Sequence, residues 1–379
     1  MSDPVAHLYL SVSDSKDPAW PGRWAGALAR ERELRFPVGR PHLSPRALLV
    51  GGARPDVLGT ELPDLVRRVL GAGGARGLDE WTVEVDDPSL PEELVRAWIE
   101  GGVDRLSLRG EAARPDVALR LMELVRALRP PRPVRIAAEV SLQREVSLQQ
   151  DVSLQGRGRG DGGAGTSAEQ MLEALLAAGV TSVALVEEED PSPLAGSDDP
   201  DGRAPGVWLR AAGALRRAGW TLSDLAYAHA PGHGPRYPRA LARRRPVLGL
   251  GPGAISFRHP HRRWNHPEVR PYLAAVDAGS DPVFGFEELS PAEARLERVW
   301  AALRTDEGLR LPSRDCREEP WLRRWREAGW VQSQAPTETG SERLCLTPSG
   351  WLLADDLAVE LALVVERISR GGRRMEPGV

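Results

Sequence analysis

Short apolar runs alternate with amphipathic helices over most of the chain, and this alternation limits the fold more than any other feature. Apolar runs at 47–50, 81–85, 104–108 and 181–186 are typical of buried strands. The segments between the runs space their apolar residues as helices do. Alternation of short strands and helices is the pattern of βα units around a parallel sheet. We therefore expect an α/β fold, with helices at 24–34, 62–70, 91–100, 117–128, 168–178 and 208–218.

The pattern changes near residue 289. Ser290 and Glu293 form a capping box at the start of an expected helix over 291–303. Further on, the sequence predicts a helix, a short strand and a last long helix, at 321–328, at 343–346 and from Thr347 onward. We expect two domains, a barrel-like unit over 1–288 and a small C-terminal α+β unit over 289–379. The second unit is winged-helix-like or, as an equal alternative, an irregular helical cap.

A tandem repeat interrupts the first unit. The pentapeptide Glu-Val-Ser-Leu-Gln occurs at 139–143 and 145–149, and a third copy at 151–155 begins with Asp. The period of six is even, so all copies would keep the same strand alternation. The first copy is expected to complete a strand. The other copies and the Gly-rich stretch 156–165 are interpreted as part of an insertion that spans about 139–165.

Composition narrows the function classes. The 379 residues are 41% hydrophobic and 27% charged, which is ordinary for a globular chain. A net charge of -4 and a pI of about 6.1 give no indication of a nucleic-acid partner or an anionic membrane surface. The sequence has no uninterrupted apolar run of about 20 residues, so no membrane span is expected. With only two cysteines, Cys316 and Cys345, a reducing and therefore cytoplasmic location is expected.

Several short segments resemble a known family in their order and spacing. Val50–Pro55 is similar to a Gly-Gly-Gly-Thr-Pro turn, and Thr82–Leu90 is similar to a Glu-Ala-Asn-Pro segment. Further matching segments are 7–15, 102–108, 231–254, 263–265, 287–291, 303–309 and 346–350. Together they resemble the HemW-type haem chaperones and oxygen-independent coproporphyrinogen III oxidases of the radical SAM superfamily. The resemblance implies a partial or distorted TIM-like barrel.

The cysteines that define this family are missing. The family holds a [4Fe–4S] cluster on a C-x3-C-x2-C motif after its first strand, because thiolates are the ligands such clusters use. The equivalent positions here are Ser15, Ala19 and Gly22, and no cysteine precedes Cys316. We therefore predict that the chain binds neither a [4Fe–4S] cluster nor SAM.

Other family residues are also replaced. A His-Asn-x-x-Tyr-Trp stretch, associated with haem in the chaperone branch, corresponds to Tyr237–Ala242, and the His of Gly-Pro-Gly-Ala-His-Ser is Ile255. We interpret the chain as a catalytically degenerate member, a pseudoenzyme that binds haem, another tetrapyrrole or a protein partner such as an active paralogue. Two alternatives stay open: a haem chaperone that works without the cluster, and a decaying gene product.

Two groups of residues are candidates for ligand binding. The first group is glycines expected at strand ends, which let a ligand approach the backbone: Gly51, Gly52, Gly249, Gly251 and Gly253. The alternative is retained turn geometry. The second group is His259, His261 and His266, with arginines nearby for haem propionates. His259 and His261 are expected to share one face of a strand, and the alternative is a solvated basic loop. No metal ion is assigned.

A group of carboxylates is a third candidate site. Glu84, Asp86 and Asp87 lie in and after a strand and could act as an acid pair. The sequence shows no base or nucleophile beside them, so no catalytic residue is assigned.

Overall fold

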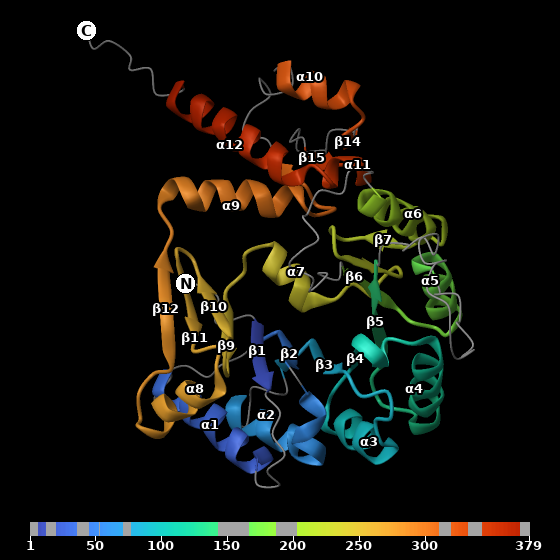
Figure 1. Cartoon of the computed structure of the whole chain (residues 1–379), viewed down its shortest axis with the longest axis vertical. Coiled ribbons are helices and arrows are strands. Elements are labelled where there is room, and N and C mark those ends of the chain that lie inside the picture. The colour runs from blue at the N-terminus through green and yellow to red at the C-terminus, as the bar shows by residue number, and fades with distance from the viewer. Residues whose placement is uncertain are drawn as a thin grey trace, which may run out of the picture.

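One long, curved sheet forms the body of the molecule (Figure 1). The computed structural model describes residues 7–12, 20–35, 45–52, 54–70, 77–142, 167–186, 203–310, 320–332 and 343–371. In these ranges the sheet has 12 strands in the order β12-β11-β10-β9-β1-β2-β3-β4-β5-β6-β8-β7. Because the order ends in β12 and β7, the described strands form an open sheet and not a closed barrel.

The centre of the sheet is parallel. Its seven strands are β1 (His7–Val12), β2 (Ala47–Gly52), β3 (Glu80–Val85), β4 (Arg105–Leu108), β5 (Arg135–Ser141), β6 (Ser182–Val186) and β9 (Val247–Leu250). Antiparallel strands extend both sides: β10 (Ile255–Arg258), β11 (His261–Asn265) and β12 (Val283–Glu288), then β7 (Thr221–Leu222) and β8 (Tyr227–His229). The expected α/β class with a mostly parallel sheet is confirmed.

Helices connect the parallel strands. They are α1 (Trp20–Arg35), α2 (Leu62–Leu70), α3 (Glu92–Gly101), α4 (Pro115–Leu128), α5 (Ala168–Ala177) and α6 (Arg203–Arg217), with a 3-10 segment at Pro55–Glu61. Figure 1 shows them around the outside of the curve, whereas α7 (Arg236–Ala242) lies on the concave side. Tyr237 of α7 packs there against Ala47, Leu49 and Val247. The helix α8 (Val269–Asp277) joins β11 to β12.

Alternation along the strands gives the sheet two different faces. In β3, Trp81, Val83 and Val85 are buried in the main core with the apolar residues of the outer helices. Glu80 and Glu84 alternate with these residues and therefore point to the concave face. The same alternation places Arg105 of β4 and Glu139 of β5 on that face. The concave side is thus lined by charged side chains at both ends of the strands.

The C-terminal region packs on the same body. It contains α9 (Pro291–Leu303), α10 (Pro320–Glu327), α11 (Pro348–Trp351), α12 (Ala354–Gly371) and a sheet of β13 (Leu309–Arg310), β14 (Val331–Gln332) and β15 (Arg343–Leu346). The strand order is β13-β15-β14. The capping box of Ser290 and Glu293 is confirmed at the start of α9. The main core includes Leu303 of α9 and Leu357 of α12 together with residues of the large sheet.

The prediction of one long C-terminal helix from Thr347 is wrong. A turn separates α11 from α12, at Leu352 and Leu353. Gly350 weakens the helix there, and its Cα lies against the carbonyl group of Trp330. The Trp351 indole donates a hydrogen bond to the Leu303 carbonyl oxygen at 3.0 Å, which fixes the short helix on α9.

The first three residues of the first repeat copy belong to β5. This strand runs through Glu139 and Val140 to Ser141, and the N–H of Leu142 donates to the Val186 carbonyl oxygen at 2.8 Å. The other copies and the Gly-rich stretch lie outside the described residues. In the described part of the chain, no helix is long and apolar enough to cross a membrane.

Candidate functional site

The predicted glycine positions lie at the carboxyl ends of two parallel strands. Gly51 and Gly52 end β2, and Gly52 has a positive φ of 110°. The Glu84 carboxylate of the neighbouring β3 lies directly on Gly51, where a Cβ atom would overlap it. The N–H of Gly52 donates to Glu84 Oε2 at 3.1 Å. The Glu84 side chain therefore fills the space beside Gly51 in which a ligand could approach the backbone.

The second set of glycines belongs to the turn after β9. A Cβ atom on Gly249 would overlap the backbone of Ile255, so glycine is needed for the approach of β10. Gly251 and Gly253 have positive φ values of 100° and 65°. The N–H of Gly251 donates to the buried Glu31 carboxylate at 2.8 Å. Glu31 also accepts a hydrogen bond from the Tyr272 hydroxyl at 2.7 Å, so this turn is tied to α1 and α8.

The carboxylates of β3 have a partner that sequence reasoning missed. Arg109, directly after β4, forms an ion pair with Glu84 and lies 3.5 Å from Asp86 and 3.8 Å from Glu139. These four residues come from three adjacent strand ends, and we call them the carboxyl-end cluster. Ends of parallel strands meet at one edge of a sheet. Because Arg109 and Glu139 also lie at the ends of predicted strands, this rule could have placed them beside Glu84 from the sequence alone.

Protonation of the cluster is shifted by its surroundings. Burial raises the pKa of Glu84, although the nearby Arg109 guanidinium and the Gly52 N–H oppose the rise. Burial also raises the pKa values of Asp86 and Glu139, again against the effect of Arg109. Three carboxyl groups around one guanidinium can therefore hold a proton at a higher pH than isolated carboxyl groups would. The arrangement suits holding or moving a proton at these oxygen atoms.

The three predicted histidines do not form one site. β10 and β11 form a hairpin in which His259 and Pro260 make the turn, so His259 and His261 do not share a strand face as expected. Both are exposed at this turn. His266 follows the other end of β11, where its ring lies 5.4 Å from that of Phe284. His266 is five residues further along the chain than His261, a span of about 16 Å in an extended strand.

The arginines of the hairpin are already paired. Arg262 contacts Glu287 at 2.9 Å and Glu297 at 2.8 Å, and Arg263 contacts Asp281. The region is therefore an ion-paired hairpin and not a solvated loop. In the described ranges, no group of three or more His, Cys, Asp or Glu side chains is arranged to hold a metal ion.

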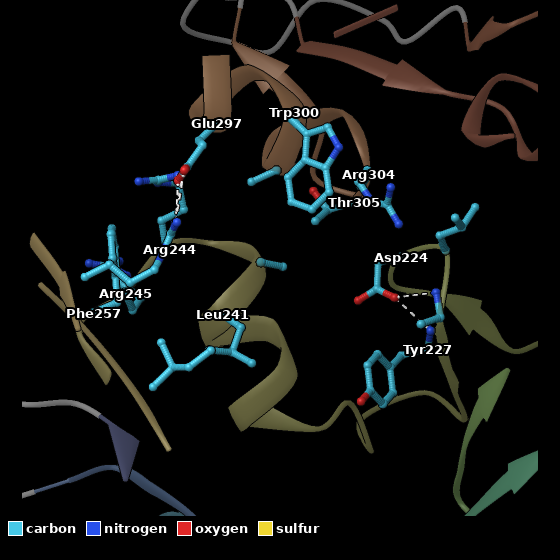
Figure 2. A pocket seen from close by; sticks show the side chains of 16 residues that line it. Asp224, Tyr227, Leu241, Arg244, Arg245, Phe257, Glu297, Trp300, Arg304 and Thr305 are labelled. Atoms are coloured by element: carbon cyan, nitrogen blue, oxygen red, sulfur yellow. Dashed lines mark hydrogen bonds and ion pairs between the residues drawn. The ribbon is translucent and has the colours of Figure 1, made fainter. Parts of the chain in front are cut away.

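A cavity of about 370 Å³ opens beside the concave face. This volume is in the range of roughly 300–1,000 Å³ that small-molecule sites occupy. Its walls come from α7, α9, the β10–β11 hairpin and the start of β8. Figure 2 shows Leu241 on one side and Trp300 on another, with Arg244 and Glu297 opposite Asp224 and Tyr227. The cavity therefore combines apolar surfaces with charged groups.

Tyr227 connects the cavity with the carboxyl-end cluster. It lines the cavity, and burial together with the negative charges of Asp224, Glu84 and Glu139 raises its pKa to about 12. Burial raises the pKa of Asp224 to about 6, against hydrogen bonds that its carboxylate accepts from the N–H groups of Ala226 and Tyr227. The phenol therefore remains a proton donor at neutral pH.

The residues present do not fit an iron–sulfur cluster. Gly22 lies in α1 and has no side chain, and Ser15 and Ala19 lie outside the described residues. Cys345 is buried in β15, part of the small C-terminal sheet, with its Sγ 3.6 Å from the Asp306 carbonyl oxygen. Cys316, the second of the two cysteines in the chain, lies outside the described residues. A cluster held by three thiolates has too few ligands here.

Comparisons with known proteins find a likeness among the solved structures. No family model and no curated protein sequence matches the chain. Among solved structures, the chain is similar to the coproporphyrinogen III oxidase HemN from Escherichia coli, described as a radical SAM enzyme, with a TM-score of 0.64 and 14% sequence identity. The likeness covers 94% of this chain and 90% of that one. At this identity it shows the fold alone: the chain has the same overall fold as that protein.

Proposed function

We propose that the chain is a catalytically degenerate relative of the HemN-like enzymes that binds a tetrapyrrole carrying carboxylate side chains. The observation that supports this most is the cavity, in which guanidinium groups stand beside apolar side chains. Arg244 and Arg262 supply the positive charge, and Leu241, Ile255 and Trp300 supply apolar surface. Tetrapyrroles with propionate groups present the same combination, a flat apolar ring with carboxylates on its rim. Guanidinium groups recognise carboxylates through two parallel hydrogen bonds.

The loss of cluster chemistry is the second part of the proposal. The chain has fewer cysteines than the three thiolates that a [4Fe–4S] cluster of this type requires. The Glu84 carboxylate also occupies the space beside Gly51 at the end of β2. What remains is a cavity beside the concave face that is lined by apolar and charged side chains. A binding role for this pocket needs no reducing equivalent and no cleavage of a cofactor. A protein partner such as an active paralogue would then exchange ligand with it.

Fluorescence titration with coproporphyrin III tests the proposal on the full chain. We expect saturable binding, and weaker binding in Arg244→Gln because one guanidinium is lost. Coproporphyrin tetramethyl ester, which keeps the ring but has no free carboxylate, should bind at least about tenfold more weakly, a difference of about 1.4 kcal/mol. The matched control Arg67→Gln removes a surface arginine of α2 that pairs with Asp64. Non-saturable binding, or equal affinity for acid and ester, would refute the proposal.

A further inference from the structure

Arg244 has an unusual backbone conformation at the edge of the cavity. It follows the end of α7 with a φ of 53°. Its N–H donates to the Leu241 carbonyl oxygen at 2.8 Å, and the Arg245 N–H donates to the Ala240 carbonyl oxygen at 2.9 Å. This is the pairing of a Schellman motif, in which the left-handed residue is usually glycine. A side chain crowds the backbone in this conformation. The Arg244 backbone is therefore strained at the point where its side chain enters the cavity wall.

Two guanidinium groups share one ring and one carboxylate in this wall. The guanidinium carbon of Arg244 lies 4.8 Å from the centre of the Phe257 ring, and that of Arg262 lies 5.8 Å from it. Both guanidinium groups contact the carboxylate of Glu297, and Arg262 approaches its two oxygen atoms at 3.0 and 2.8 Å. Arg262 also contacts Glu287. Like charges are therefore held together by the ring and by Glu297.

Glu297 leaves part of Arg244 unsatisfied. The Arg244 side chain is only 16% exposed. Its Nη2 atom is buried and has no hydrogen-bond partner in the described part of the chain. Burial lowers the pKa of Arg244, as do the nearby positive charges of Arg262 and Arg298. Buried donors on a charged group are almost always paired in folded proteins. The wall thus offers a hydrogen-bond donor to another acceptor, and the cavity as a whole is lined by four arginines and two carboxylates.

Glu297 and Trp300 reach the cavity from the same face of α9. They are three residues apart in the helix, which puts them one above the other, and both line the cavity. Figure 2 shows the Trp300 ring over the space next to the contact between Arg244 and Glu297. Leu241 and Ile255 are 48% and 53% exposed and also line the cavity. An acid group near Arg244 would therefore have an apolar surface beside it for the rest of a molecule.

We propose that Arg244 and Arg262 form an anion subsite for amphipathic organic acids, and that Glu297 is an internal carboxylate that occupies this subsite when no ligand is bound. A ligand binds with its acid group at Arg244 and its apolar body against Leu241, Ile255 and Trp300. Its acid group competes with the Glu297 carboxylate for the guanidinium groups. The inference deepens the proposed function because it concerns the same cavity, but it applies to acids other than tetrapyrroles.

The competition distinguishes this role of Glu297 from that of a structural clasp. A clasp that only joins α9 to α7 and β11 would support the cavity, so its loss would weaken binding or leave it unchanged. An internal competitor has the opposite effect. Removing its charge frees Arg244 and leaves Arg262 with Glu287 as its carboxylate partner, so affinity for an acid ligand rises. The sign of the change in affinity in Glu297→Gln therefore decides between the two roles.

The probe is 8-anilinonaphthalene-1-sulfonate, an aromatic acid whose fluorescence rises on binding, titrated into the full chain at low salt. We expect Glu297→Gln to lower its Kd about tenfold and Arg244→Gln to raise it about tenfold, the effect of about 1.4 kcal/mol each way. The uncharged analogue N-phenyl-1-naphthylamine should bind wild type and Glu297→Gln equally. Matched controls are Glu92→Gln and Arg67→Gln, each of which removes one partner of a surface ion pair far along the chain from the cavity residues.

An unchanged or higher Kd in Glu297→Gln overturns the inference, and so does the absence of saturable binding in all variants. If Glu297→Gln does not fold, as judged by circular dichroism, Glu297→Asp replaces it. The shorter side chain withdraws the carboxylate from the arginines, so a lower Kd is again expected and an unchanged Kd refutes the inference. Coproporphyrin III that fails to bind while the sulfonate follows the expected pattern refutes the tetrapyrrole proposal alone.

Discussion

Glu80 and Arg105 form a buried ion pair at the amino-terminal ends of the parallel strands. Glu80 Oε2 lies 3.1 Å from Arg105 Nη2, and the two side chains are 0% and 1% exposed. Glu80 Oε1 accepts a hydrogen bond from the Arg236 N–H at the start of α7, at 2.8 Å. Arg105 donates to Ser182 Oγ at 2.7 Å and to the His233 carbonyl oxygen at 2.9 Å. The pair thus joins three strands to the helix that fills the concave side.

Removing one partner of this pair should be strongly destabilising. Glu80→Leu leaves the Arg105 charge buried without its carboxylate, at a cost of about 3–5 kcal/mol in the free energy of unfolding. The double variant Glu80→Leu, Arg105→Met removes both charges, so it should cost less than the sum of the two single variants. Urea unfolding followed by circular dichroism measures both. A loss below about 1 kcal/mol in Glu80→Leu would show that the pair does not hold α7 on the sheet.

The raised pKa of Asp224 predicts a pH dependence. Burial raises its pKa in the folded chain to about 6, from the ordinary value of 3.8. The folded state therefore binds the proton more tightly, and stability falls as pH rises from about 4 to about 6. Asp224→Asn keeps the oxygen that accepts from Ala226 and Tyr227 but cannot ionise. It should be more stable than wild type at pH 7, on the order of 3 kcal/mol, with no difference below pH 4. The measurement is the thermal midpoint of both proteins across this pH range. A difference between them that is the same at every pH would contradict the raised pKa of Asp224.

Iron–sulfur reconstitution tests the absence of a cluster. Anaerobic incubation with iron and sulfide should give no stable [4Fe–4S] species, because the chain has two cysteines where three are needed. Absorption spectroscopy and iron analysis of the desalted protein are the measurements, with apo-HemN from Escherichia coli as the positive control. A broad charge-transfer band at about 400 nm, together with about four irons per chain, would refute the pseudoenzyme interpretation.

The fold was predictable because its signals are local. The 3.6-residue spacing over Leu62–Leu70 predicts α2 with its observed ends, and the capping box of Ser290 and Glu293 predicts the start of α9. The apolar run at 47–50 predicts β2, although the two glycines after it also belong to the strand. Such signals depend on neighbours within a few residues, which one sequence displays directly.

The candidate site was mostly not predictable, because its residues meet only in three dimensions. Arg109 and Glu84 are 25 residues apart, and Arg244 and Glu297 are 53 apart. Nothing in the spacing of Arg244 and Glu297 indicates that α9 crosses the end of α7. The three histidines are close in the sequence, but the structure does not bring them together in space. The hairpin turn at His259 puts His266 at the opposite end of β11.

Deletion of the later repeat copies should leave stability nearly unchanged. β5 ends at Ser141 and α5 begins at Ala168, so Arg144–Gly156 can be removed while a connection remains. Loop closure changes by only about 0.6 kcal/mol for each doubling of loop length. The thermal midpoint of the deletion variant is the measurement. A fall of more than about 5 °C, which for a chain of this size exceeds 1 kcal/mol, would mean that the copies are part of the sheet.

The assignment of a haem ligand to His259, His261 or His266 stays a prediction. None of the three lines the cavity, and His259 and His261 are exposed at the hairpin turn. Ring recognition and iron ligation can therefore be separated. The variant His259→Ala, His261→Ala, His266→Ala should keep the wild-type affinity for metal-free coproporphyrin III, because the cavity arginines are untouched. It should lose at least about tenfold in haemin affinity if an imidazole of the hairpin ligates the iron.

Titrations that follow the Soret band in wild type and the variant give both values. Equal haemin affinity in the two proteins would refute ligation by these histidines, and His229, whose buried Nε2 has no partner among the described residues, would be tested next.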